Sequence, residues 1–135
     1  MKSKKNTSPV RSRDKVLQSL YEIELGGSTV EEILEDKIIQ KNYPHFKDLL
    51  IGVTESISEL DDLLQKIMER DLSGLDPIER NALRLAIYEM LHSDLDKPII
   101  INESIRLTKK YGAEDGYKFV NAVLDKALKT NLQQV

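Results

Sequence analysis

A short stretch near the end of the sequence interleaves aromatic rings with cationic side chains and an amide. Aromatic rings can stack on unpaired bases, lysines can hold phosphates, and an asparagine can bond the edge of a base. The same side chains can also pack the junction of two helices without any ligand, and the pattern alone favours that simpler role. The members of this stretch are Lys109, Lys110, Tyr111, Tyr117, Lys118, Phe119 and Asn121.

The first fifteen residues form a second cationic feature. They carry a net charge of +5, whereas the remaining 120 residues carry −8. A basic arm on an acidic body indicates a polyanionic partner such as nucleic acid. A solvated tail that keeps the chain in solution would have a similar composition. The basic residues of this feature are Lys2, Lys4, Lys5, Arg11, Arg13 and Lys15.

The groups that catalysis requires are largely missing from this composition. The 135 residues contain no cysteine and only His45 and His92, which excludes disulfides and thiolate metal sites and disfavours histidine-based acid–base clusters. The sequence has no glycine-rich phosphate loop, no nucleophile–His–acid set and no cluster with metal-ligand spacing. We therefore expect no enzyme activity, no cofactor and no metal site.

Length and hydropathy bound the organisation of the chain. No apolar run approaches the roughly 20 residues of a membrane helix, and the N-terminus lacks the apolar segment of a secretory signal. These absences predict a cytoplasmic protein without a membrane partner. The length indicates one domain, over residues 9–135, and the polar residues 1–8 are expected to be a flexible basic arm.

A helix over residues 76–91 is the element around which we expect the others to be organised. Asp76 can cap its first turn, Pro77 suits the first helical position, and Glu79 is placed to complete a capping box. Apolar residues occupy two faces of this helix. Other helices are therefore expected to cover it from more than one side.

Helical spacing of apolar residues recurs along the rest of the chain, and no segment shows strand alternation of useful length. The predicted fold class is all-α, with about seven helices. Over residues 45–71 the spacing fits either one long helix or two, with Ser58 and Asp61 at the start of the second. The other expected helices cover residues 9–26, 28–42, 99–111 and 117–128. The second of these is expected to start with a capping box within residues 28–32.

Three stretches of the sequence resemble the NusB family of bacterial transcription antitermination factors. The last third, IINESIRLTKKYGAEDGYKFVNAVLDKAL, carries the family's hallmark, and LDPIERNALRLAIYEM is similar to its central helix. Arg11 and Arg13, followed by LQSLYEIEL, are similar to its first helix. Two positions depart from the family pattern. Ala122 replaces the usual Gly at what is expected to be a tight helix contact, and Gly116 replaces the common Ser.

The resemblance implies an all-helical fold of two small bundles and a role in transcription antitermination. It implies binding to the boxA element of nascent ribosomal RNA transcripts together with NusE, a small-subunit ribosomal protein, within the RNA polymerase antitermination complex. The basic arm residues would meet phosphates, and Asp115, Lys118, Phe119 and Asn121 would lie on the RNA side. Tyr21 and Glu79 would lie at or near the NusE surface.

Other interpretations of the same residues stay open. Tyr21 can be the rim of a core, Glu79 a capping-box acid, and Asn121 a buried polar link between helices. The helical domain is also similar to the N-terminal module of certain ribosomal RNA cytosine methyltransferases, although no S-adenosylmethionine domain follows it here. A helical protein–protein adaptor or a homodimer without an RNA role is the main alternative, and the basic arm argues against it.

Overall fold

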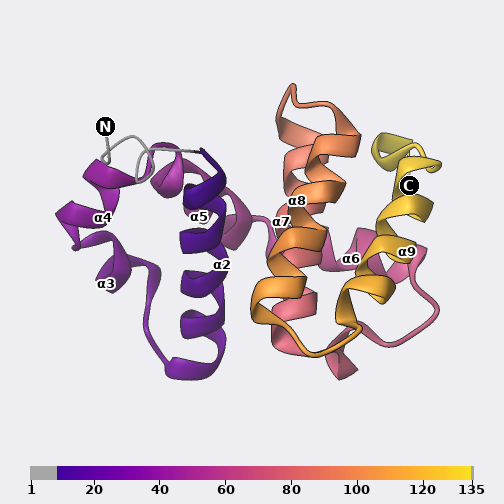
Figure 1. Ribbon diagram of the computed structural model, residues 1–135, viewed down its shortest axis with the longest axis horizontal. Helices are drawn as coiled ribbons and strands as arrows, with labels where there is room; N and C mark the ends of the chain where they lie inside the picture. Colours follow the sequence, from indigo (N-terminus) through magenta and orange to yellow (C-terminus); the bar gives the residue numbers. More distant parts are fainter. Residues whose placement is uncertain (1–8, 135) are drawn as a thin grey trace. The chain divides into compact units, whose positions relative to one another are not determined.

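The computed structural model describes residues 9–134, and every regular element within that range is a helix (Figure 1). The predicted all-α fold is confirmed, with eight α-helices in the described range where about seven were expected. Two short 3-10 turns, η1 (Leu72–Gly74) and η2 (Leu132–Gln134), accompany them. The α-helices are α2 (Pro9–Gly26), α3 (Val30–Leu34), α4 (Lys37–Asn42), α5 (Phe46–Glu55), α6 (Ile57–Ile67), α7 (Pro77–His92), α8 (Lys97–Tyr111) and α9 (Gly116–Leu128).

The chain divides into two compact units, and the first ends at Glu55. Within this unit α2, α3 and α4 all pack on α5. Helix α5 presents Phe46, Leu50 and Val53, which recur at helical spacing and are fully buried. A single apolar stripe on α5 therefore supplies the centre of this small bundle. The prediction that residues 9–135 form one domain stays a prediction.

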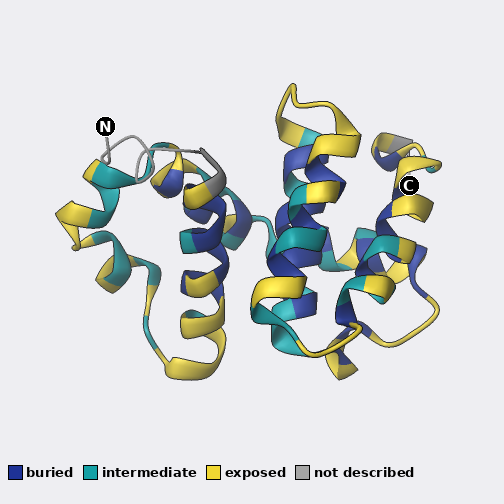
Figure 2. Ribbon diagram, in the orientation of Figure 1, coloured by how far each residue is buried: buried dark blue, intermediate teal, exposed yellow. Residues whose placement is uncertain are grey.

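The second unit begins at Ser56 and is built around α7. Helices α6, α8 and α9 all pack on α7, and ten of its 16 residues are buried. Figure 2 shows buried residues in dark blue along α7, and within this helix only His92, at its end, is exposed. The expectation of a central helix covered from several sides is therefore confirmed. Such coverage follows from its two apolar faces.

Burial of α7 leaves polar side chains that need partners inside the unit. Arg84 donates from Nε to Asp61 Oδ1 at 2.7 Å and from Nη2 to Asp61 Oδ2 at 2.8 Å, which ties α7 to α6. Its Nη1 donates to Asn81 Oδ1 at 3.0 Å, and Asn81 Nδ2 in turn donates to the Pro77 carbonyl at 2.9 Å. The bidentate Arg84–Asp61 pair fixes the relative orientation of the two side chains as well as pairing their charges.

Two helix boundaries differ from the sequence-based expectations. The helix expected over residues 28–42 is divided at Glu35, because Asp36 accepts from the Ile38 and Ile39 N–H groups and starts a new helix. Over residues 45–71 the structure has two helices, and the second starts at Ile57 after Ser56. The expected start at Ser58 and Asp61 is wrong, since both lie inside α6 and Asp61 is the partner of Arg84.

None of the helices in the described range is long and apolar enough to cross a membrane.

The predicted capping box at the start of the second expected helix is present. Thr29 accepts from the Glu32 N–H at 3.1 Å, and Glu32 Oε1 accepts from the Thr29 N–H at 2.8 Å. Gly27, with a φ of +79°, follows the last residue of α2 as expected for a helix terminated by glycine.

Asp61→Ala should lower the free energy of unfolding by about 1–3 kcal/mol, because two N–H groups of a largely buried guanidinium lose their acceptor. Urea denaturation monitored by circular dichroism measures the change. Asp62→Ala is the matched control, since it removes the same charge from the adjacent, exposed position and should cost no more than about 0.5 kcal/mol. Equal losses in the two variants would contradict a structural role for the Arg84–Asp61 pair.

Candidate nucleic-acid interface

The turn between α8 and α9 brings the predicted RNA-binding side chains of the second unit together. Helix α8 ends where Gly112 N–H donates to the Thr108 carbonyl at 2.9 Å. A Cβ on Gly112 would lie 2.8 Å from that carbonyl oxygen, so this position requires glycine. Asp115 then takes the left-handed conformation, with a φ of 68°, directly before α9 begins. We call the cluster formed by Lys109, Lys110, Tyr111, Tyr117, Lys118 and Phe119 the α8–α9 corner.

Each aromatic ring of the α8–α9 corner has a cation above it. The Lys109 Nζ lies 4.6 Å from the centre of the Tyr117 ring, and the Lys110 Nζ lies 5.2 Å from the centre of the Tyr111 ring. The two lysines are exposed and the two rings are half-buried. Cation–π contacts of this kind orient the ammonium groups while leaving them hydrated on their outer side.

Phe119 is half-buried and has its cation from a different part of the chain. The Arg70 guanidinium carbon lies 4.6 Å from the centre of the Phe119 ring. Arg70 is exposed and belongs to the loop that follows α6. The ring is therefore neither a fully buried core residue nor a bare surface residue, because one side packs into the unit and an arginine lies over it.

The remaining predicted RNA-side residues lie on the first two turns of α9. Lys118 Nζ pairs with Asp115 Oδ1 at 3.3 Å, and both side chains are 65% exposed. An ion pair this exposed is worth little, because water screens it and two long side chains must be ordered. Lys118 can therefore leave Asp115 for another anion at little cost. Asn121 is half-buried one turn further on.

Glu79 is 8% exposed and lies against the start of α9. A Cβ on Gly116 would lie 2.9 Å from Glu79 Cδ and would also crowd Oε2, so the carboxyl group rests on the glycine. Burial raises the pKa of Glu79, the Asp76 carboxylate raises that pKa further, and the Arg70 guanidinium lowers it. Glu79 thus lies close to Gly116 and within electrostatic reach of Arg70.

The capping box expected at Glu79 is wrong. Among the described residues it is Asp76 that caps α7, by accepting from the Ile78 N–H at 2.8 Å. Glu79 instead turns across to α9, because Gly116 leaves room there for the carboxyl group.

The expectation of a tight helix contact at Ala122 is also wrong, since Ala122 is exposed.

The cationic residues of the first unit do not share one surface. Lys2, Lys4 and Lys5 lie outside the described residues. Arg11 is exposed, whereas Arg13 is 6% exposed and is engaged in at least one polar or ring interaction. Side chains two positions apart on a helix are rotated by roughly 200° around its axis, so the two arginines point to different sides. Lys15 is half-buried, with its Nζ 5.8 Å from the centre of the Tyr43 ring.

Tyr21 lies on an apolar part of the surface of α2. It is 39% exposed, and Leu25, one turn later, is 54% exposed. Residues four apart are neighbours on a helix surface, so the two side chains form a small apolar pair. This exposure distinguishes Tyr21 from the buried residues of the same helix, Val16, Leu17 and Leu20.

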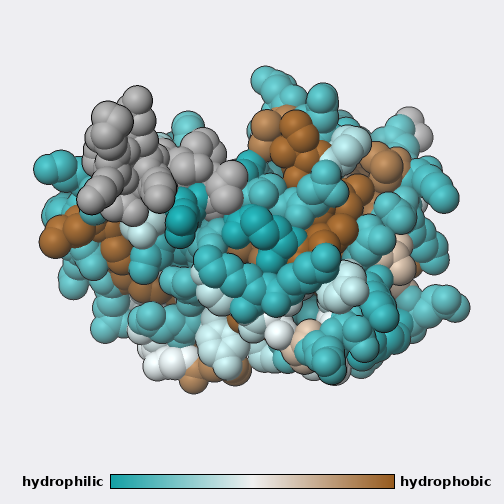
Figure 3. Space-filling model, in the orientation of Figure 1, coloured by the Kyte–Doolittle hydropathy of each residue, from teal (hydrophilic) through white to brown (hydrophobic). Residues whose placement is uncertain are grey.

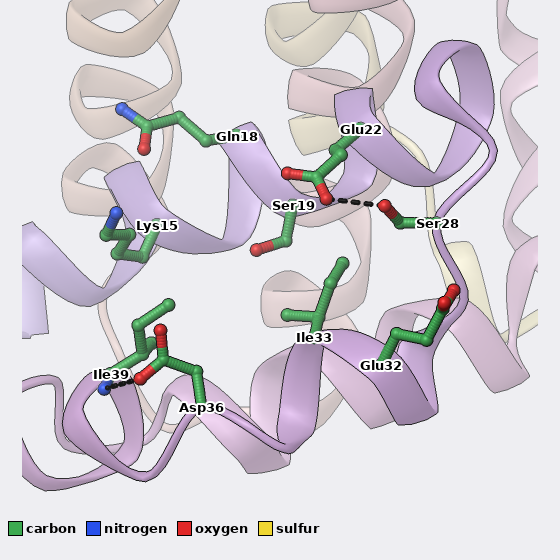
Figure 4. Close-up of a pocket in the computed structure, with 9 residues that line it drawn as sticks. All are labelled: Lys15, Gln18, Ser19, Glu22, Ser28, Glu32, Ile33, Asp36 and Ile39. Carbon is green, nitrogen blue, oxygen red and sulfur yellow. Dashed lines mark hydrogen bonds between the residues drawn. The ribbon is translucent and has the colours of Figure 1, made fainter.

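A cavity of about 300 Å³ lies in the first unit between α2 and the α3–α4 segment (Figure 4). Three carboxylates and one lysine line it. The carboxylates already serve local structure: Glu22 accepts from the Ser28 hydroxyl at 2.5 Å, Glu32 completes the Thr29 capping box, and Asp36 caps α4. A lining with this excess of negative charge repels phosphate, so the cavity is not the nucleic-acid interface.

Apolar side chains of the second unit gather away from the α8–α9 corner. The face shown in Figure 3 is mostly hydrophilic, with apolar atoms concentrated over the α8 region. Ile99 lies in the first turn of α8 and is exposed, whereas Lys109 lies near the end of that helix. Ten residues of helix separate them by about 15 Å. The exposed large apolar residues of this unit are Leu95, Ile99 and Leu128.

Comparison with known proteins identifies the fold. The model of the NusB family matches residues 10–129. A transcription antitermination protein NusB from Shewanella amazonensis is 33% identical over 127 residues, which are 90% of this chain and 95% of that protein. The structure of T. maritima NusB has a TM-score of 0.83 at 32% identity, covering 96% of this chain and 99% of that one.

A structure described as antitermination factors NusB and NusE in complex with dsRNA has a TM-score of 0.75 at 29% identity, covering 96% of this chain and 98% of that one. The two helical bundles therefore define an all-helical fold that solved NusB structures share over nearly their whole length. The match to the family model covers most of the sequence as well. The chain belongs to the NusB family, as its sequence motifs indicated.

Arg70 is the residue of this site that sequence reasoning missed. In the sequence it stands between Glu69 and Asp71 in a polar loop, with no periodic relation to Phe119. Its place over the ring depends on how the loop after α6 approaches α9, and no local pattern specifies that approach. An arginine in the segment between α6 and the central helix was the only available signal.

Glu79→Gln should change how stability depends on pH. The folded-state pKa of Glu79 lies above the 4.5 of an unperturbed glutamate, so the folded state binds this proton more tightly than the unfolded state does. Its contribution to stability is fully present below the unfolded pKa and is lost as the pH rises through the raised folded pKa. The difference in unfolding free energy, variant minus wild type, should therefore be larger at about pH 7 than at about pH 4.

Denaturant titrations of both proteins over a pH series measure this difference. Glu114→Gln is the control, because it removes one negative charge from an exposed glutamate in the turn that precedes α9. The same trend in both variants would contradict the assignment of the pH dependence to the burial of Glu79.

Proposed function

We propose that this protein is an antitermination factor that binds boxA-type single-stranded RNA of nascent ribosomal RNA transcripts together with NusE. The observation that carries the proposal is the half-buried Phe119 at the start of α9, with cations around it. Base stacking requires a ring that is fixed on one side and can receive a flat group on the other, and the flat group over Phe119 in this structure is the Arg70 guanidinium. The relatives are named as antitermination proteins, not as enzymes.

The charges around Phe119 support an RNA ligand over a protein ligand. Lys109, Lys110 and Lys118 are exposed, and two of them rest on aromatic rings while the third makes only an exposed ion pair. These ammonium groups can therefore exchange their present neighbours for phosphates at small cost. Arg11 adds an exposed cation on the first unit. The proposed RNA contacts also include Lys2, Lys4 and Lys5, which precede the described residues.

NusE is the protein partner that we propose. One solved relative is described as NusB and NusE in complex with dsRNA. Tyr21 and Leu25 offer the exposed apolar pair that a protein interface uses as an anchor. Glu79 is too covered to be the centre of such an interface, so we propose that it acts there by holding the first turn of α9 in place.

A titration tests the function directly. The protein should bind a boxA-like single-stranded RNA more tightly than a scrambled strand, and more tightly still with NusE present. Replacing Lys4, Lys5 and Arg11 by Gln should flatten the dependence of affinity on salt by roughly 0.7 for each phosphate that is no longer neutralised. Equal affinity for boxA-like and scrambled RNA, or preference for a duplex of the same sequence, would overturn the proposed specificity. An unchanged salt dependence would remove the arm from the interface.

Phe119→Ala should weaken RNA binding by about 1–3 kcal/mol if the ring stacks on a base. Phe119→Tyr keeps the ring and should bind nearly as well. The other phenylalanine of the chain, Phe46, is fully buried and is the natural control. Phe46→Ala should reduce stability by about 3–5 kcal/mol, whereas Phe119→Ala should cost clearly less. RNA titrations and denaturant unfolding of the three variants decide this. A folded Phe119→Ala protein with wild-type RNA affinity would exclude the stacking role.

A further inference from the structure

The loop that follows α6 is held by side-chain hydrogen bonds at Arg70 itself and at the residues after it. Gln65, in the last turns of α6, donates from Nε2 to the Arg70 carbonyl at 2.8 Å, and its Oε1 accepts from the Leu72 N–H at 2.9 Å. One amide side chain therefore clamps the backbone before and after Asp71. Arg80 of α7 donates from Nη1 to the carbonyls of Leu72 and Leu75 at 3.3 and 2.8 Å. The backbone of this exposed loop is thus fixed by helices on either side.

The side chain of Arg70 is held by two groups of different kinds. Its guanidinium lies over the Phe119 ring, with 4.6 Å between the guanidinium carbon and the ring centre. The Glu79 carboxyl group, buried against Gly116, lies within its electrostatic reach. Arg70 nevertheless remains exposed. Among the residues that the structure describes, this charged, planar group is therefore ordered at the surface without a close ion pair.

We propose that Arg70 is an RNA-binding residue that extends the Phe119 ring into a two-layer stacking platform. This inference rests on the proposed function of Phe119. An arginine plane stacks on an aromatic face and can itself receive a base, while its N–H groups donate to a phosphate. The inner face of the guanidinium is taken by Phe119, and the exposed outer side is available to a nucleotide. Gln65 acts as a positioning residue because it fixes the backbone that carries Arg70.

The geometry also allows the opposite use, in which Arg70 covers the ring and must leave before a base can stack. The two uses differ in the sign of one measurement. Loss of a ligand group weakens RNA binding, whereas loss of a cover strengthens it. The clamp by Gln65 supports the ligand role, since a cover that has to move gains nothing from a rigid support.

The test is a titration of the full-length protein with a boxA-like single-stranded RNA at several salt concentrations. Arg70→Ala should reduce affinity about tenfold and flatten the salt dependence by roughly 0.7. Arg70→Lys keeps the charge without the plane, so it should restore the salt dependence but recover less than half of the lost binding free energy. Gln65→Ala should reduce affinity about threefold while leaving the salt dependence unchanged, because no charge is removed.

Lys66→Ala is the matched control, because it removes an equal charge from an exposed position on α6 four residues before Arg70. It should leave affinity within about twofold of wild type. Thermal unfolding should show that all variants are folded. Arg70→Ala with unchanged or increased RNA affinity would overturn the proposal, as would full recovery by Arg70→Lys. Phe119→Ala is run in parallel: if it too leaves RNA affinity unchanged, the proposed function fails, whereas if only Arg70→Ala does so, the platform alone fails.

Discussion

The near-complete burial of α7 is the constraint on which the second unit depends. A helix covered by α6, α8 and α9 together must satisfy every polar group that it carries into the interior. Arg84 meets this requirement through Asp61 and Asn81, and the buried carboxyl group of Glu79 lies against Gly116 at the start of α9. The position of α9, and with it the place of Phe119, therefore follows from how α7 is covered.

Several cations in and beside the α8–α9 corner lie over aromatic rings. Lys109 over Tyr117 and Arg70 over Phe119 are examples. A cation–π contact at an exposed site is worth about 0.5–1 kcal/mol and leaves most of the hydration of the charge in place. A carboxylate partner would neutralise the local potential, whereas a ring does not. The acidic body can in this way maintain one surface on which positive potential persists.

The sequence alone predicted the helical class, the central position of α7 and the capping box at Thr29. These features depend on periodicity and on residues a few positions apart, which are visible in the chain itself. The break at Asp36 was missed because a cap inside an apolar pattern resembles an ordinary helix interior. The placement of Arg70 over Phe119 was missed because it joins residues about fifty positions apart through the packing of three helices. The site residues on α9 were found mainly through the family motif, since their pattern alone fitted a simple helix junction.

Each of the two units is made from one unbroken stretch of chain, with Ser56 as the only residue between α5 and α6. The helices that pack on α5 in the first unit, α2, α3 and α4, all precede it in the sequence. All of them have therefore been synthesised by the time residue 55 is added to the growing chain. Contacts between neighbouring segments close short loops and form quickly. Ribosomes add roughly 5–20 residues per second, far more slowly than small helical bundles pack. The order of the chain therefore suits vectorial folding, in which the N-terminal bundle assembles while the second is still being synthesised.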